Sequence, residues 1–166
     1  MARLFYAFAL LAVAVSAAVI LTTSADLPMR VASHFNAAGD GSGFMSLDEY
    51  RRLMLALAVA MPLGIVAALG LLPRVAPGLV NVPNARAWLS PPYRDETLAT
   101  LGMRGALCAI LITAFICAVH LLIVRANAQS PVHLDATALG VVVGAFVLAI
   151  AAWVIALILR FRKPPR

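Results

Sequence analysis

Three histidines and one carboxylate are the residues of this chain whose types could act together on a ligand. They are His34, His120, His133 and Asp135. Imidazole nitrogens and carboxylate oxygens bind Zn²⁺ in proteins. These residues are scattered along the chain and lack the compact H-x-x-x-H spacing of a helical metal pair. Two hypotheses follow: a shared metal or proton site, or separate structural roles in a turn and between helices.

The segment from Asp40 to Glu49 matches the later ligand positions of an EF-hand calcium loop. Ala38 stands where the first, anionic ligand should be. Gly39 and Pro28 also argue against a helix entering the loop. We therefore expect no tight Ca²⁺ binding here.

Other catalytic signatures are missing from the sequence. Cys108 and Cys117 lie inside one apolar run, where packing is their expected role. The chain has no phosphate loop, nucleophile elbow, haem-attachment motif or zincin motif. We expect a protein that is not an enzyme and that has no cofactor. The interiors of the apolar runs also lack acidic residues, which argues against a proton-coupled transporter.

The elements that position these residues follow from the composition. The chain has 166 residues, of which 63% are hydrophobic and 12% are charged. A soluble domain carries only about 45–50% apolar residues, so the expected surroundings are a lipid bilayer. The net charge of +6 comes from basic residues that are dispersed along the chain. This distribution excludes a basic nucleic-acid-binding patch, and we expect no nucleic-acid partner.

Four apolar runs approach the roughly 20 residues that a helix needs to cross the hydrocarbon core. The predicted transmembrane helices are 4–22, 51–73, 104–125 and 135–160. The predicted fold is an all-α integral membrane four-helix bundle, with residues 1–166 as one membrane domain. Residues 23–50 would form a structured extracytoplasmic loop and residues 74–103 a cytoplasmic loop. Thr23-Ser24-Ala25 also fits a signal-peptidase site, so cleavage of the first run is the alternative to a retained helix.

Basic residues predict the orientation. Nine Lys and Arg flank the spans on the side of the termini, and four flank them on the other side. The positive-inside rule then places both termini in the cytoplasm, with the four spans in an inner, cytoplasmic-type membrane. The loop at 23–50 would lie outside, and Ser46 and Glu49 there form an S-x-x-E capping box that starts the second helix.

This loop carries a motif of Leu-Pro, His-Phe-Asn and Gly-aromatic-x-Ser. The residues that match it are Leu27, Pro28, His34, Phe35, Asn36, Gly39, Gly43, Phe44 and Ser46. The motif resembles that of the uncharacterised bacterial membrane-protein family whose domain also forms the N-terminal part of SdpI-type immunity proteins. A second segment, with Asn81, Asn84, Trp88 and Pro91, is similar to that of the single-domain members.

The resemblance implies a sensing, immunity or signalling protein whose outer loop meets a peptide or membrane-protein partner. His34, Phe35, Asn36, Gly39 and Gly43 would be its ligand-binding or partner-binding residues. Phe35 would insert between the outer ends of the helices, and Asn36 would bond to its own turn. Two alternatives stay open: an accessory subunit of a larger membrane complex, and a small transporter or outer-face metal site.

Three further predictions concern the helices and the cytoplasmic loop. Ser90 and Pro91 predict a short helix that ends near Leu101. Trp88, Tyr93 and Arg94 would form an interfacial anchor at the membrane surface. Gly140 and Gly144 form a G-x-x-x-G motif, which fits either an oligomer interface or a contact within the bundle.

Overall fold

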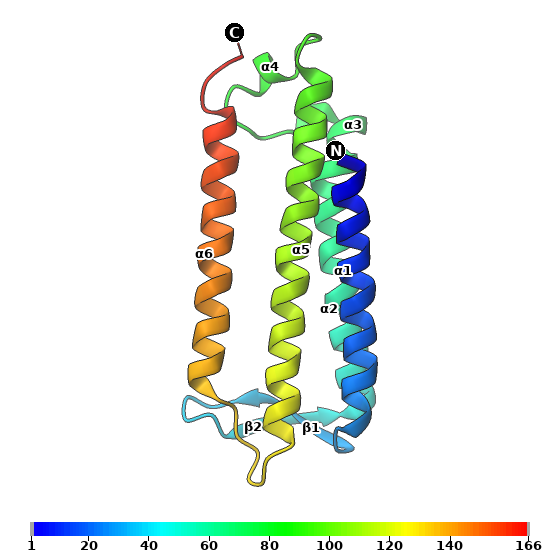
Figure 1. Ribbon diagram of the computed structural model, residues 1–166, viewed down its shortest axis with the longest axis vertical. Coiled ribbons are helices and arrows are strands. Elements are labelled where there is room, and N and C mark those ends of the chain that lie inside the picture. The colour runs from blue at the N-terminus through cyan, green and yellow to red at the C-terminus, as the bar shows by residue number, and fades with distance from the viewer. Residues whose placement is uncertain (1, 166) are drawn as a thin grey trace.

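The computed structural model describes residues 2–165, and four long helices dominate it (Figure 1). These are α1 (Ala2–Thr23), α2 (Leu47–Val66), α5 (Arg94–Asn127) and α6 (Ala136–Phe161). Strands β1 (Arg30–Phe35) and β2 (Gly41–Ser46) form an antiparallel hairpin. The short helical segments are η1 (Ser24–Asp26), η2 (Ala67–Leu71), α3 (Leu72–Val75), η3 (Pro77–Leu79) and α4 (Ala85–Trp88).

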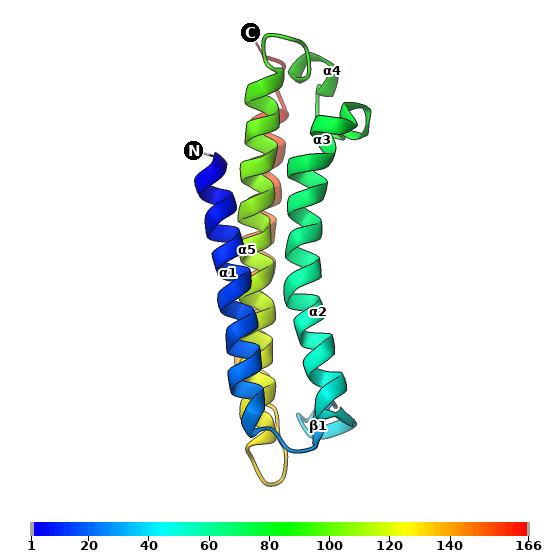
Figure 2. The same ribbon diagram turned by 90° about the vertical axis from the view of Figure 1, so that its right-hand side faces the viewer.

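The two ends of the bundle differ. Both ends of the chain lie at one end, with α3 and α4, and we call this the terminus end (Figures 1 and 2). The hairpin and the α5–α6 loop lie at the opposite end, which we call the hairpin end (Figure 1). All four long helices run between these ends, so the chain passes four times along the bundle.

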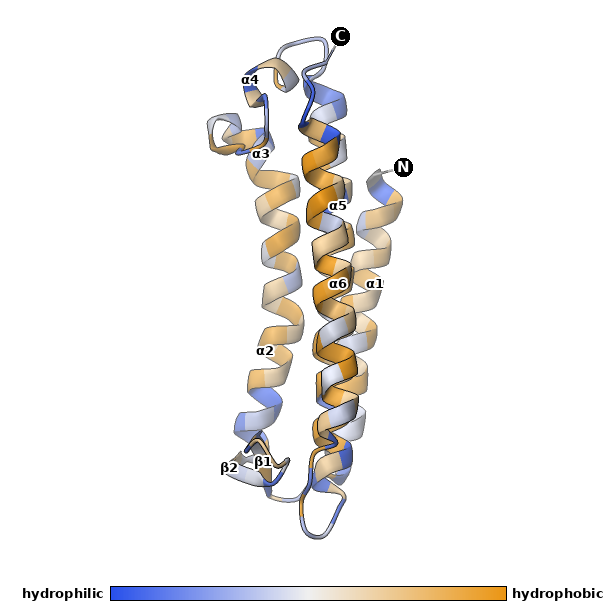
Figure 3. Ribbon diagram, turned by 90° about the vertical axis from the view of Figure 1, so that its left-hand side faces the viewer, coloured by the Kyte–Doolittle hydropathy of each residue, from blue (hydrophilic) through white to orange (hydrophobic). Residues whose placement is uncertain are grey.

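Four stretches are long and apolar enough to cross a membrane, which agrees with the predicted spans. They are Arg3–Asp26, Leu47–Val75, Arg94–Asn127 and Ala136–Phe161. Apolar residues cover most of their length, and polar residues gather toward the two ends (Figure 3). Such a surface suits a multi-pass membrane protein, because hydrocarbon surrounds the middle of each span.

Helix α5 is the centre of the bundle and packs against each of the other long helices. Small residues permit this close packing. A Cβ added to Gly105 would lie only 2.8 Å from Leu69 Cβ, so α5 and η2 could not approach this closely with a larger residue. Helix α6 packs chiefly on α5, where Phe115 and Phe146 stack with ring centroids 4.2 Å apart.

The sequence prediction needs two corrections. The predicted short helix from Pro91 is wrong, since residues 91–93 form a turn and one continuous helix runs from Arg94 to Asn127. Asp95 and Glu96 in its first turn favour this start, because carboxylates stabilise the positive end of the helix dipole. The all-α prediction is also incomplete, because the loop after α1 contains the β-hairpin.

The predicted capping box at the start of α2 is confirmed. Ser46 Oγ accepts a hydrogen bond from Glu49 N at 3.2 Å, and Glu49 Oε2 accepts one from Ser46 N at 3.0 Å. This pairing ends β2 and begins α2 within one residue, so the hairpin is fixed directly to the bundle.

Candidate functional site

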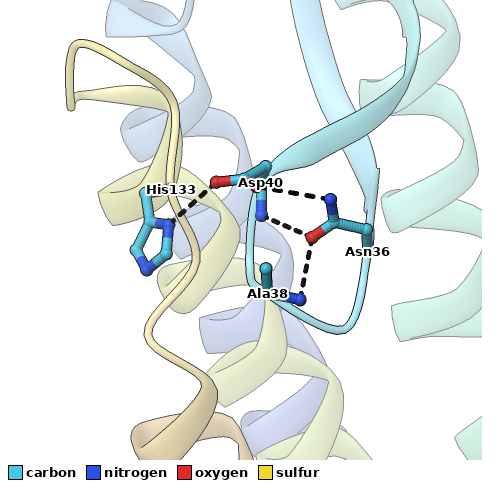
Figure 4. A network of polar contacts seen from close by, with 4 residues as sticks. All are labelled: Asn36, Ala38, Asp40 and His133. Carbon is cyan, nitrogen blue, oxygen red and sulfur yellow. Dashed lines mark hydrogen bonds and ion pairs between the residues drawn. The ribbon is translucent and has the colours of Figure 1, made fainter.

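The turn between β1 and β2 is organised by Asn36. Its Oδ1 accepts hydrogen bonds from Ala38 N and Asp40 N, each at 2.9 Å, and its Nδ2 donates to Asp40 Oδ2 at 3.3 Å (Figure 4). The backbone N–H of Asn36 also donates to Asp40 O at 2.9 Å. The predicted bond of Asn36 to its own turn is therefore confirmed.

The same turn is attached to the α5–α6 loop. Leu134 N donates to Gly39 O at 2.8 Å, and Asp40 Oδ1 lies 3.4 Å from His133 Nδ1 (Figure 4). Gly39 has φ +92°, and an added Cβ would lie 2.6 Å from Leu134 O. Backbone conformation and contact distance both require glycine at this position.

A second attachment comes from Asn127, the last residue of α5. Its Oδ1 accepts from Ala32 N at 2.8 Å, and its Nδ2 donates to Ala32 O at 3.0 Å and to Ile123 O at 2.9 Å. The side-chain amide thus pairs with β1 as a neighbouring strand would. Both residues are buried, and the paired amide satisfies backbone groups that would otherwise lack partners.

Phe35 lies where the sequence predicts it. Its ring packs against Leu122 and Ala126 of α5 and against Leu134. His34 lies opposite Gly43 in the hairpin, and its side chain is exposed. Its Nδ1 lies 3.1 Å from Ser33 Oγ. A Cβ on Gly43 would lie 3.0 Å from His34 Cβ, so glycine leaves room for the imidazole.

Beside Phe35 is a cavity of about 280 Å³ between the hairpin, α5 and α6. Ser33 and His34 contribute its polar groups. Apolar side chains form the rest of the lining: Phe35, Val119, Leu122, Ile123, Leu134 and Leu139. A mostly apolar pocket with a few polar groups is the usual form of a site for a small or peptide ligand.

His120 lies deeper, fully buried between α1, α2 and α5. Its Nδ1 is 2.8 Å from Tyr50 Oη, and its Nε2 is 2.7 Å from Thr23 Oγ1. The Thr23 hydroxyl donates to Val19 O at 2.7 Å, so Nε2 must carry the hydrogen and Nδ1 must accept from Tyr50. A neutral imidazole on α5 therefore satisfies the hydroxyl groups of Tyr50 on α2 and Thr23 on α1. This is the contact between helices that the structural hypothesis for His120 requires.

The hypothesis of a shared metal site is wrong for these residues. His120 uses both ring nitrogens within the bundle, His133 contacts Asp40, and His34 lies on the hairpin. Asp135 Oδ1 instead accepts from Ala138 N at 2.9 Å and caps α6. Within residues 2–165, no group of three or more His, Cys, Asp and Glu side chains is arranged to hold a metal ion.

The residues that resemble an EF-hand also have separate partners. Asp40 belongs to the turn and contacts Asn36 and His133, whereas Glu49 caps α2 through Ser46. Their carboxylates are thus held by different elements, β-turn and helix, rather than by a calcium loop between two helices.

The predicted position of Trp88 at the membrane surface, on the terminus end, is wrong. Trp88 is buried against Phe161, and its Nε1 donates to Phe161 O at 3.3 Å. Asn84 Nδ2 also donates to Phe161 O, at 3.1 Å, because the last carbonyls of α6 need donors. Tyr93 contacts the edge of the Trp88 ring, and Arg94 begins α5.

Gly140 and Gly144 face open space, since an added Cβ at either would meet no other atom within 4 Å. The hypothesis that the G-x-x-x-G motif makes a helix contact within the bundle is therefore wrong. The motif lies on a face of α6 that other helices of this chain leave uncovered.

The sequence alone does not indicate the roles of Asn127, Tyr50 and Thr23, whose side chains join distant segments. Asn127 and Thr23 had a weak signal, as polar residues at the ends of apolar runs. Their partners, Ala32 and His120, lie 95 and 97 residues away, and no local pattern reveals such pairs.

Comparison with known proteins adds no relative: the chain matches no family model, no curated protein and no solved structure.

Proposed function

We propose that this protein is an inner-membrane sensing, immunity or signalling protein that binds a peptide or envelope partner at its hairpin end. The observation that supports this proposal most is the cavity beside Phe35, with Ser33 and His34 among its lining residues. The proposal places the hairpin end outside the cell and both termini in the cytoplasm. The resemblance of the His-Phe-Asn motif to SdpI-type proteins agrees with it.

The fixed position of the hairpin also supports a binding role. Asn127 binds β1, Gly39 binds the α5–α6 loop, and Ser46 joins β2 to α2. A site held by three elements loses little conformational entropy when a ligand arrives. An exposed His34 beside an apolar cavity would recognise a ligand with one apolar group and one hydrogen-bonding group.

The test is peptide selection on the protein in nanodiscs. A displayed library of random decapeptides is selected on the parent, and the enriched peptides are measured against variants. We expect His34→Gln and the cavity-filling Leu139→Phe to weaken binding at least tenfold, with unchanged melting temperatures. Arg86 is exposed at the terminus end, so Arg86→Gln is the matched control and should bind the selected peptides like the parent.

Two results would contradict the proposal. One is the absence of any peptide enriched over empty nanodiscs. The other is a parallel loss of binding and melting temperature in His34→Gln, which would make His34 an organiser of the loop only.

A second candidate function is an accessory subunit, or an oligomer of this chain, that uses α6. It is favoured by the open face at Gly140 and Gly144 and by the large apolar residues exposed along α6. Substituting Gly144→Leu should then reduce the particle mass in mild detergent, because the close helix approach is lost. An unchanged mass would count against this function, with Gly64→Leu on α2 as the control for an equally open glycine.

A further inference from the structure

A groove between α1 and α2 opens at the terminus end of the bundle, away from the proposed peptide site. Its volume is about 220 Å³. Ala109 of α5 and Leu71 of η2 are part of its lining, and the other lining side chains come from α1 and α2. Those used below are Tyr6, Leu10, Val13, Leu63, Val66 and Leu71.

The groove follows the direction of a lipid chain. Tyr6 and Val13 are seven residues apart on one helix, which corresponds to roughly 10 Å along the bundle axis. Every lining residue is apolar apart from the hydroxyl of Tyr6. That hydroxyl is buried, and Cβ atoms added to Gly70 or Gly102 would collide with it. It therefore faces the contact between η2 and α5 rather than the groove.

The mouth of the groove is positively charged. Arg3 precedes Tyr6 by three residues and Arg74 follows Leu71 by three, so each lies about one turn beyond the lining, toward the terminus end. Both side chains are exposed, and neither forms an ion pair with a carboxylate in the described part of the chain. Arg74 Nη1 reaches within 3.7 Å of a Cβ built on Gly102, beside the Tyr6 ring.

Acidic residues are absent from the two helices at this mouth. Helix α1 has no Asp or Glu, and the acids of α2 are Asp48 and Glu49, at the hairpin end. On α5, Glu96 pairs with Arg160 at 2.6 Å, and Asp95 of the same first turn forms no ion pair with Arg3 or Arg74 in the described part of the chain. Two unpaired cations at the membrane surface therefore attract an anion, and an apolar groove below them accepts a hydrocarbon chain.

We infer that this groove binds one anionic glycerophospholipid of the leaflet at the terminus end. One acyl chain lies between α1 and α2, along Leu10 and Leu63. The phosphate lies at the mouth, between the Arg3 and Arg74 guanidinium groups. A zwitterionic phosphatidylcholine is disfavoured, because its choline cation would lie near the same two arginines.

Native mass spectrometry of delipidated protein tests the assignment. Phosphatidylglycerol and phosphatidylcholine with identical acyl chains are titrated separately. We expect at least tenfold tighter binding of phosphatidylglycerol, and a loss of about fivefold for each of Arg3→Gln and Arg74→Gln. Leu10→Trp, at an exposed position, should fill the groove and reduce binding of both lipids.

Three comparisons make the result decisive. Arg86→Gln, an exposed arginine at the same end but outside the groove, should bind like the parent. Excess inorganic phosphate should not displace the lipid, because the acyl chain contributes to binding. Equal affinity for the two lipids, or parent-like binding by Leu10→Trp with an unchanged melting temperature, would overturn the inference.

Discussion

His120 illustrates how one side chain can join three helices. It accepts from Tyr50 of α2 and donates to Thr23 of α1, so every polar atom of the network has a partner. Networks of this kind stabilise a structure only when all of their members are satisfied. His120 therefore belongs to the interior of the bundle, whereas His34 and His133 are exposed, and of these two His34 lines the cavity of the proposed site.

Substitution of His120 tests this assignment. His120→Phe should destabilise the protein by about 1–3 kcal/mol, because the buried Tyr50 hydroxyl loses its acceptor. The double variant His120→Phe with Tyr50→Phe should recover much of this loss, since both partners are then apolar. Thermal unfolding in detergent measures both. Additive losses in the double variant would show that the two residues do not act as a pair.

Gly39 tests the joint between the turn and the α5–α6 loop. Gly39→Ala should destabilise the hairpin end, because alanine tolerates φ +92° poorly and its Cβ would collide with Leu134 O. Gly64→Ala is the control: it is helical with open space around it, and should be neutral or stabilise by up to about 1 kcal/mol. Unfolding temperatures that fall equally for both variants would contradict this explanation.

At the scale of elements, the hairpin depends on a helix residue far away in sequence. Asn127→Leu removes two hydrogen bonds to Ala32 and leaves that buried backbone pair unsatisfied. We expect faster amide hydrogen exchange across residues 30–35, with little change in α6. His133→Ala should have a smaller effect, because its contact with Asp40 is exposed and such pairs contribute about 0–1 kcal/mol. Exchange unchanged in Asn127→Leu would show that Asn127 does not hold β1.

These elements also show which features a sequence can predict. Helices α1, α2, α5 and α6 could be predicted because membrane spans depend on local apolar length, and the α2 start depends on Ser46 and Glu49 alone. The hairpin could not, because β2 is glycine-rich and β1 lacks a strict alternation of buried and exposed residues. Its position depends on Asn127 and on the α5–α6 loop, which are distant in sequence.

The residues of the candidate site also include some whose roles could be predicted from the sequence and some whose roles could not. The roles of Phe35 and Asn36 follow from residue type and neighbouring glycines, so they could be predicted. Whether His34, His120, His133 and Asp135 meet depends on the packing of different elements, and the structure separates them. The burial of Trp88 likewise depends on the end of α6, which its own segment does not reveal.

At the scale of the whole molecule, the four spans place the chain termini at one end and the hairpin at the other (Figure 1). The proposed partner site on the hairpin and the proposed lipid groove at the opposite end both depend on the orientation of the chain in the membrane. The nine-to-four distribution of basic residues favours cytoplasmic termini. The hairpin would then meet partners outside the cytoplasm, and the arginines of the groove would meet the inner leaflet.

Cysteine labelling in intact bacterial cells tests this orientation most directly. Ser42→Cys on the exposed face of β2 and Arg86→Cys on α4 are made in a background with Cys108→Ala and Cys117→Ala. A membrane-impermeant maleimide is added before or after the cells are opened. The account predicts that Ser42→Cys reacts in intact cells and Arg86→Cys only in opened cells. Labelling of Arg86→Cys but not Ser42→Cys in intact cells would contradict it.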